Sequence, residues 1–147
     1  MILRSPSIFC MDMADCPNNL LHLYIMNGRM TQGRMAEDIA LEWLQKEGME
    51  LRERNWRSEH KEIDLIMESN DFLHIVEVKS LKFPSSIAPF EQVDWLKQRF
   101  LVRAARRYIR SRNITKEVRF DIVSIMFHKD GTTDLEFIPA AFFPIYY

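Results

Sequence analysis

The sequence has 147 residues and a mass of 17.6 kDa, enough for one domain with a real core and too little for two. Its apolar fraction of 47 % and charged fraction of 28 % exclude a disordered or fibrous protein. No apolar run approaches the roughly 18–20 residues of a membrane helix, and the first residues make a poor secretory signal. We therefore expect a cytoplasmic protein that does not contact membranes.

The first 29 residues show no sustained periodicity. We interpret 1–29 as an N-terminal tail, for which disorder is one option, and place the folded domain at 30–147. Both cysteines, Cys10 and Cys16, lie in the tail and lack the spacing of a zinc site. We expect reduced thiols, although the spacing alone also allows a disulfide between them.

The first strong element is an amphipathic helix. Its apolar residues recur at helical spacing from Thr31, a predicted N-cap, to Gly48, a predicted stop, and Glu37 lies near the first turn. Three strands are predicted next, at 49–56, 62–67 and 72–79. A short polar turn separates the last two, so we expect them to form a hairpin.

The second half predicts another helix and two more strands. After a loop with two prolines, helical periodicity runs from about Phe90 to Ser111. Strands are predicted at 118–127 and 135–138. This order of elements favours an α/β fold in which a mixed central sheet of about five strands is flanked by helices.

Positive charge is concentrated late in a chain whose formal net charge is only -1. The basic block comprises Lys97, Arg99, Arg103, Arg106, Arg107, Arg110, Arg112, Lys116 and Arg119, with Glu117 as the one acid among them. Such a block can neutralise phosphates, and we predict nucleic-acid contacts at Lys97, Arg103 and Arg107, together with Arg34. The alternative is a solvated helix face with no ligand.

The residues with the clearest chemistry are Asp64 on one strand and Glu77, Val78 and Lys79 on the next. Strand alternation places Glu77 and Lys79 on one face, and the hairpin brings Asp64 close to them. Two neighbouring carboxylates repel each other unless a cation lies between them. With the carbonyl of Val78 they offer the oxygen ligands that Mg²⁺ or Mn²⁺ prefers, and Lys79 could orient a water or stabilise developing charge.

Asp64 followed by Glu77-x-Lys79 is similar to the motif of the PD-(D/E)XK nucleases, with Ile63 in place of the motif's proline. Further matching segments are Gly33-Arg34-x-x-Glu37, Asn55-Trp56-Arg57, Glu62-Ile63-Asp64-Leu65-Ile66, Val76-Glu77-Val78-Lys79, Lys97-Gln98 and Arg119-Phe120-Asp121. Together they resemble the bacterial UPF0102 family, also called YraN-like. The resemblance implies a restriction-endonuclease-like fold similar to archaeal Holliday-junction resolvases, in which Glu37 matches a helix glutamate of the metal site.

Three positions depart from the family pattern. Ala36 and Lys61 stand where glycine is usual, and Leu81 stands where an arginine commonly follows the Glu-x-Lys strand. None of these changes removes a proposed metal ligand. The missing arginine would weaken contact with phosphate, and it is the departure that weighs most against activity.

The sequence thus predicts a Mg²⁺- or Mn²⁺-dependent endonuclease acting on DNA, with branched or structured DNA as a candidate substrate. Its catalytic residues would be Glu37, Asp64, Glu77 and Lys79, with the metal held by Asp64, Glu77 and Val78. A homodimer would suit junction cleavage, which requires two symmetric sites. The alternatives are a non-catalytic nucleic-acid- or partner-binding module, a structural protein that associates through its aromatic C-terminus, and a purely structural ion-pair network around Asp64.

Overall fold

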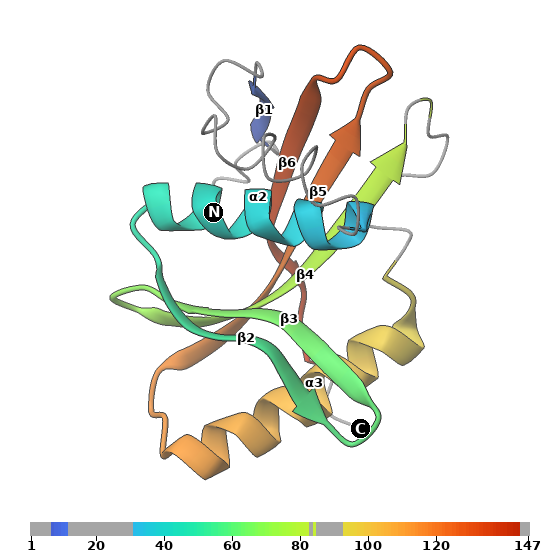
Figure 1. Cartoon of the computed structure of the whole chain (residues 1–147). Coiled ribbons are helices and arrows are strands. Elements are labelled where there is room, and N and C mark those ends of the chain that lie inside the picture. Colours follow the sequence, from blue (N-terminus) through green and yellow to red (C-terminus); the bar gives the residue numbers. More distant parts are fainter. Residues whose placement is uncertain (1–6, 12–30, 83, 85–92, 145–147) are drawn as a thin grey trace.

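The computed structural model describes residues 7–11 by their backbone, and 31–82, 84 and 93–144 with side chains. Figure 1 shows two helices on opposite sides of one sheet. The elements are β1 (Ser7–Met11), α2 (Gln32–Lys46), β2 (Glu50–Ser58), β3 (Lys61–Glu68), β4 (Phe72–Lys82), α3 (Trp95–Arg112), β5 (Glu117–Phe127) and β6 (Thr133–Phe142). In this part of the chain, neither helix is long and apolar enough to cross a bilayer.

The sheet is mixed, with six strands in the order β1-β6-β5-β4-β3-β2. Only β4 and β5 run parallel, and α3 connects them as the crossover helix. All five predicted strands form, so the predicted α/β class is confirmed. The additional strand β1 lies within the predicted tail, of which 1–6 and 12–29 fall outside the described residues, as does Cys16.

Two apolar layers fill the space between the sheet and the helices. On one face, buried residues of α2 such as Trp43 and Leu44 pack on Val76 and Val123. On the other, buried residues of α3 such as Leu101 pack on the opposite side of the same strands. A strand between two helical layers buries both of its faces, which is why consecutive residues are buried in the middle of β4 and of β5.

Helix α2 begins and ends where the sequence predicts. The Thr31 side chain accepts a hydrogen bond from Arg34 N, and the chain turns at Gly48 with a φ of 89°, a conformation that favours glycine. Helix α3 begins later than predicted. Asp94 caps it by accepting a hydrogen bond from Lys97 N, so the helix starts at Trp95 and not near Phe90, which lies outside the described residues.

Strand β3 does not keep the simple alternation that the sequence predicts. Strict alternation would place Ile63 and Leu65 on one face, but Ile63 packs in the layer under α3 and Leu65 in the layer under α2. The change of face occurs at Asp64. On the paired strand β2, the residue between the partners of Ile63 and Leu65 is Asn55, whose φ is 53°. This local left-handed residue lets the β2–β3 hairpin twist away from β4.

Candidate functional site

The site lies where β3 separates from β4. The backbone pairing of these strands ends at Leu65 and Val76. Beyond that pair the Asp64 side chain replaces the missing backbone acceptor, since its Oδ2 accepts a hydrogen bond from Val78 N at 2.8 Å. The carboxylate is therefore fixed at the fork between the two strands.

Glu77 contributes a second carboxylate, which is only 3 % exposed. Its Oε1 lies 3.0 Å from Lys79 Nζ on the same strand, and its Oε2 lies 3.0 Å from Lys97 Nζ on α3. A buried carboxylate requires such partners because removing its charge from water is costly. Oε2 nevertheless accepts no hydrogen bond, so the Lys97 ammonium attracts it by charge but lacks the geometry of a hydrogen bond.

The two carboxylates act on each other electrostatically. Burial raises the pKa of Asp64 to about 7, and the negative charge of Glu77 contributes to this rise. The hydrogen bond from Val78 N and the charge of Lys97 oppose this shift, and Glu37 adds a smaller upward contribution. Asp64, Glu77 and Glu37 therefore share one electrostatic environment.

Glu37 approaches this environment from α2. Its Oε2 accepts a hydrogen bond from Arg54 Nη2 at 3.0 Å, and the same guanidinium donates to the neighbouring Asp38. Arg54 lies on β2 and is about a quarter exposed. It holds Glu37 and Asp38 against the β2–β3 hairpin, a positioning contact that the motif pattern did not predict.

Replacing this arginine should weaken the fold. Arg54→Leu leaves two half-buried carboxylates unpaired, and we expect a loss of about 1–3 kcal/mol in the free energy of unfolding. Arg57→Leu is the matched control, because the exposed Arg57 lies 3.7 Å from Glu62 and such pairs contribute about 0–1 kcal/mol. Urea unfolding of both variants measures the difference, and equal losses would contradict this role of Arg54.

The donor set at the fork fits a hard divalent cation. Three buried side-chain atoms of the described residues lack a hydrogen bond, namely Arg54 Nε, Asn55 Oδ1 and Glu77 Oε2. Buried polar atoms are rarely left unpaired, and of these three Glu77 Oε2 belongs to a proposed metal ligand, whereas Arg54 Nε is a donor and cannot bind a cation. The described residues contain no group of three or more His, Cys, Asp or Glu side chains placed to hold a metal ion together. Two carboxylates and one carbonyl would leave the other positions to water, as Mg²⁺ sites commonly do.

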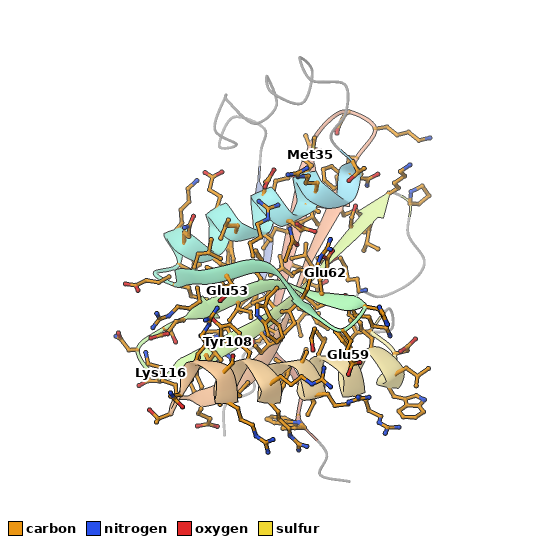
Figure 2. The ribbon with its side chains drawn as sticks, turned by 60° about the horizontal axis from the view of Figure 1, so that its bottom comes forward. Met35, Glu53, Glu59, Glu62, Tyr108 and Lys116 are labelled. Carbon is orange, nitrogen blue, oxygen red and sulfur yellow. The ribbon has the colours of Figure 1, made fainter. Side chains whose placement is uncertain are left out.

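The predicted phosphate contacts fall into different environments. Lys97 faces Glu77, whereas Arg103 and Arg107 both pair with Glu59 in the β2–β3 turn. Figure 2 shows Glu59 projecting from the hairpin toward α3. Arg34 is exposed in the first turn of α2. Three of the four predicted contacts thus already have carboxylate partners in the folded chain.

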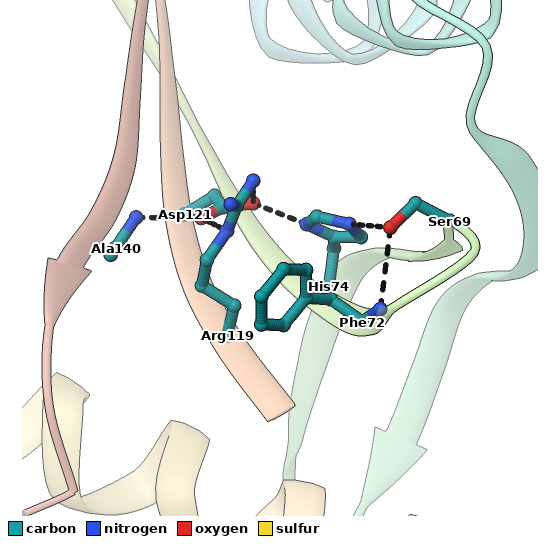
Figure 3. Close-up of polar contacts among 6 residues, drawn as sticks. All are labelled: Ser69, Phe72, His74, Arg119, Asp121 and Ala140. Carbon is teal, nitrogen blue, oxygen red and sulfur yellow. Dashed lines mark hydrogen bonds and ion pairs between the residues drawn. The ribbon is translucent and has the colours of Figure 1, made fainter. Parts of the chain in front are cut away.

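A second polar cluster lies between β4, β5 and β6 (Figure 3). His74 Nδ1 is 2.7 Å from Asp121 Oδ2, and Ser69 Oγ is 2.9 Å from His74 Nε2. This order of groups is that of a hydrolase triad, but His74 is 1 % exposed and the hydroxyl accepts a hydrogen bond from Phe72 N. We therefore assign it a structural role.

The fold and site define an α/β protein with two buried carboxylates and two lysines at a fork in a mixed sheet. The model of the uncharacterised protein family UPF0102 matches residues 36–125, and the chain belongs to this family. A UPF0102 protein of Persephonella marina is 40 % identical, covering 72 % of this chain and 96 % of the relative. One of Rhodococcus opacus is 36 % identical, covering 80 % of this chain and the whole relative.

Proposed function

We propose that the protein is a cytoplasmic, Mg²⁺- or Mn²⁺-dependent endonuclease that hydrolyses phosphodiester bonds in DNA. The supporting observation is the meeting of Asp64 and Glu77 at the strand fork, with Lys79 and Lys97 beside them. The order of Asp64 and Glu77-x-Lys79 is similar to the PD-(D/E)XK motif. The proposal therefore includes membership of that superfamily and a relationship to archaeal Holliday-junction resolvases.

Each side chain has a definite task in this proposal. Asp64 and Glu77 would hold the metal together with the carbonyl of Val78, and the bound ion would supply Lewis-acid polarisation of the phosphate and a lower pKa for a water molecule. Lys79 stabilises the negative charge that develops on the phosphoryl oxygens. Glu37, held by Arg54, orients groups on the α2 side of the fork.

Substrate and assembly are parts of the same proposal. Branched or otherwise structured DNA is the favoured substrate because of the resolvase resemblance, and a homodimer would present the two symmetric sites that a junction requires. Analytical ultracentrifugation with and without a four-way junction tests this part. A monomer that stays monomeric on the junction would contradict it and leave cleavage of simpler DNA open.

Removing either carboxylate should abolish cleavage. Glu77→Gln keeps the shape of the side chain but removes the charge, so we expect Mn²⁺ binding to disappear and the cleavage rate to fall by more than about 100-fold. Glu62→Gln on the exposed part of β3 is the matched control and should leave both unchanged. Calorimetric titration of Mg²⁺ and Mn²⁺, with branched, duplex and single-stranded DNA and RNA assayed for products, measures both effects.

The second candidate is a nucleic-acid-binding module without catalysis. It is favoured by the ammonium groups that already pair with both oxygens of Glu77, and by Leu81, which is buried where the family commonly has an arginine. Such a protein would bind nucleic acid equally well in EDTA and form no product with any metal. That result for the wild type, with no metal binding at millimolar concentrations, would replace the endonuclease proposal.

A further inference from the structure

Exposed aromatic rings flank a groove at the start of α3. Trp95 is 56 % exposed and Phe143, just beyond β6, is 72 % exposed. Both line a groove with a volume of about 270 Å³. Large apolar side chains that are exposed together around one groove commonly mark an interaction site.

The groove is also strongly basic. Arg99, Arg103 and Arg106 line it from α3, at the helical spacing that places them on the same side as Trp95. The Arg99 guanidinium lies 5.0 Å from the centre of the Trp95 ring, and Arg103 additionally lies 3.6 Å from Glu59. No Asp or Glu lines the groove in the part of the chain that the structure describes.

This groove is close to the candidate site but is distinct from it. Lys97, which contacts Glu77, and Trp95 both belong to the first turn of α3. A helix with its side chains is about 10–12 Å across, and one strand of B-form DNA advances about 3.4 Å along the helix axis for each phosphate. A strand that leaves the site near Lys97 therefore reaches the groove within about three to four nucleotides.

We propose that the groove binds unpaired nucleotides of the strand that flanks the cleaved phosphate, with bases stacking on Trp95 and Phe143 and phosphates contacting the arginines. The proposal rests on the proposed function for its link to cleavage. Aromatic platforms combined with basic side chains are the usual means of binding single strands without sequence preference. A blunt duplex keeps its bases stacked on one another and so cannot use the rings.

Other occupants fit the groove less well. Small-molecule pockets usually enclose about 300–1,000 Å³ and bury most of the ligand, whereas this groove is smaller and its two rings are largely exposed. A second copy of the chain would bring a second set of arginines to the same place, and like charges across an interface are unfavourable. A polyanion with flat apolar groups fits better, because its anionic groups can contact the arginines while its flat groups stack on the aromatic rings.

Binding in EDTA tests the proposal without cleavage. The probes are a fluorescein-labelled oligo(dT) single strand and a blunt duplex of the same length, followed by anisotropy at several salt concentrations. We expect Trp95→Ala and Phe143→Ala each to weaken oligo(dT) binding about 5- to 150-fold and duplex binding less than about twofold, because a duplex does not use the rings. Leu96→Ala is the matched control, since Leu96 is exposed on the same helix but does not line the groove.

The charged part of the groove is tested by salt dependence. Arg106→Gln should lower the slope of log affinity against log salt for oligo(dT) by about 0.7, the contribution of one phosphate contact on a single strand. Lys129→Gln removes one exposed charge from the turn between β5 and β6, away from α3 in Figure 1, and should leave the slope unchanged. If both variants lowered the slope equally, the salt dependence would come from the charge of the whole surface, and the phosphate contact at the groove would be overturned.

Fluorescence gives a direct signal for stacking. Of the three tryptophans, Trp43 is buried and Trp95 is the most exposed, so oligo(dT) should quench wild-type emission and quench Trp95→Ala much less. Wild-type affinity in both aromatic variants, equal losses for duplex and single strand, or a change only in self-association by ultracentrifugation would overturn the proposal. If oligo(dT) binding depends on Trp95 but no DNA is cleaved with Mn²⁺, the groove stands and the endonuclease proposal fails.

Discussion

Asp64→Asn should make the metal-free protein more stable at pH 8 than the wild type, while abolishing cleavage. The structural reason is the buried position of this carboxyl at the strand fork beside Glu77, which raises its pKa to about 7. Above that pH the wild type must keep an unfavourable negative charge in the fold. The amide of the variant would keep the acceptor for Val78 N without the charge, because an amide oxygen accepts the same bond.

The effect should depend on pH in a defined direction. Between the unfolded value of 3.8 and the folded value of about 7, the folded protein holds a proton on Asp64 that the unfolded chain has lost. The free energy of unfolding of the wild type therefore falls as pH rises through this window and levels off above it. This difference between the unfolded and folded pKa corresponds to at most about 4 kcal/mol of stability. The higher stability of Asp64→Asn should vanish below about pH 4.

Chemical unfolding in EDTA from pH 4 to 8 measures this difference. Asp71→Asn is the matched control, because Asp71 is exposed in the turn between β3 and β4 and its substitution should change stability by less than about 0.5 kcal/mol. Added Mn²⁺ should stabilise the wild type and not Asp64→Asn. A variant less stable than the wild type at pH 8 would contradict the unfavourable charge on Asp64.

Local sequence signals determined most of the framework. The cap at Thr31, the stop at Gly48 and the polar turn after Glu68 act through neighbouring residues, so helix α2 and the β3–β4 hairpin could be predicted without tertiary information. The same holds for Glu77 and Lys79. Their common face follows from strand alternation alone, and their side chains lie 3.0 Å apart.

The remaining features depend on contacts between distant segments. The contact between Lys97 and Glu77 is one of them, because it arises from the packing of α3 on the sheet and helical periodicity cannot show it. The nucleic-acid contact of Lys97 stays a prediction. The twist at Asn55 and Asp64 moves Ile63 to the other face against the alternation rule. The start of α3, in contrast, is a local feature. An Asp directly before the apolar stripe of a helix favours an N-cap, so Asp94 could have been identified from the sequence.

Asp121→Ala should be among the most damaging single substitutions in this fold, although the residue lies outside the candidate site. Its side chain is completely buried and accepts hydrogen bonds from His74 Nδ1, from Arg119 Nε and from Ala140 N. The pairing of β5 with β6 shifts register between Phe120 and Ile122, so the carboxylate serves as the acceptor for β6 at this irregularity (Figure 3).

Removing this carboxylate leaves the groups on three strands without their acceptor. Breaking a buried charged pair costs about 3–5 kcal/mol, a large part of the roughly 5–15 kcal/mol that stabilises a typical domain. Asp134→Ala is the matched control, since Asp134 pairs with His128 at 2.6 Å in a more exposed setting and should cost less than about 1 kcal/mol. If urea unfolding gave Asp121→Ala a loss as small as that of Asp134→Ala, the cluster would be incidental to stability. The hydrogen bonds and ion pairs of Asp121 go to His74, Arg119 and Ala140 and not to the side chains of Asp64 or Glu77. Mn²⁺ affinity measured under folding conditions should therefore remain that of the wild type, which separates the structural role of Asp121 from the chemistry proposed for Asp64 and Glu77.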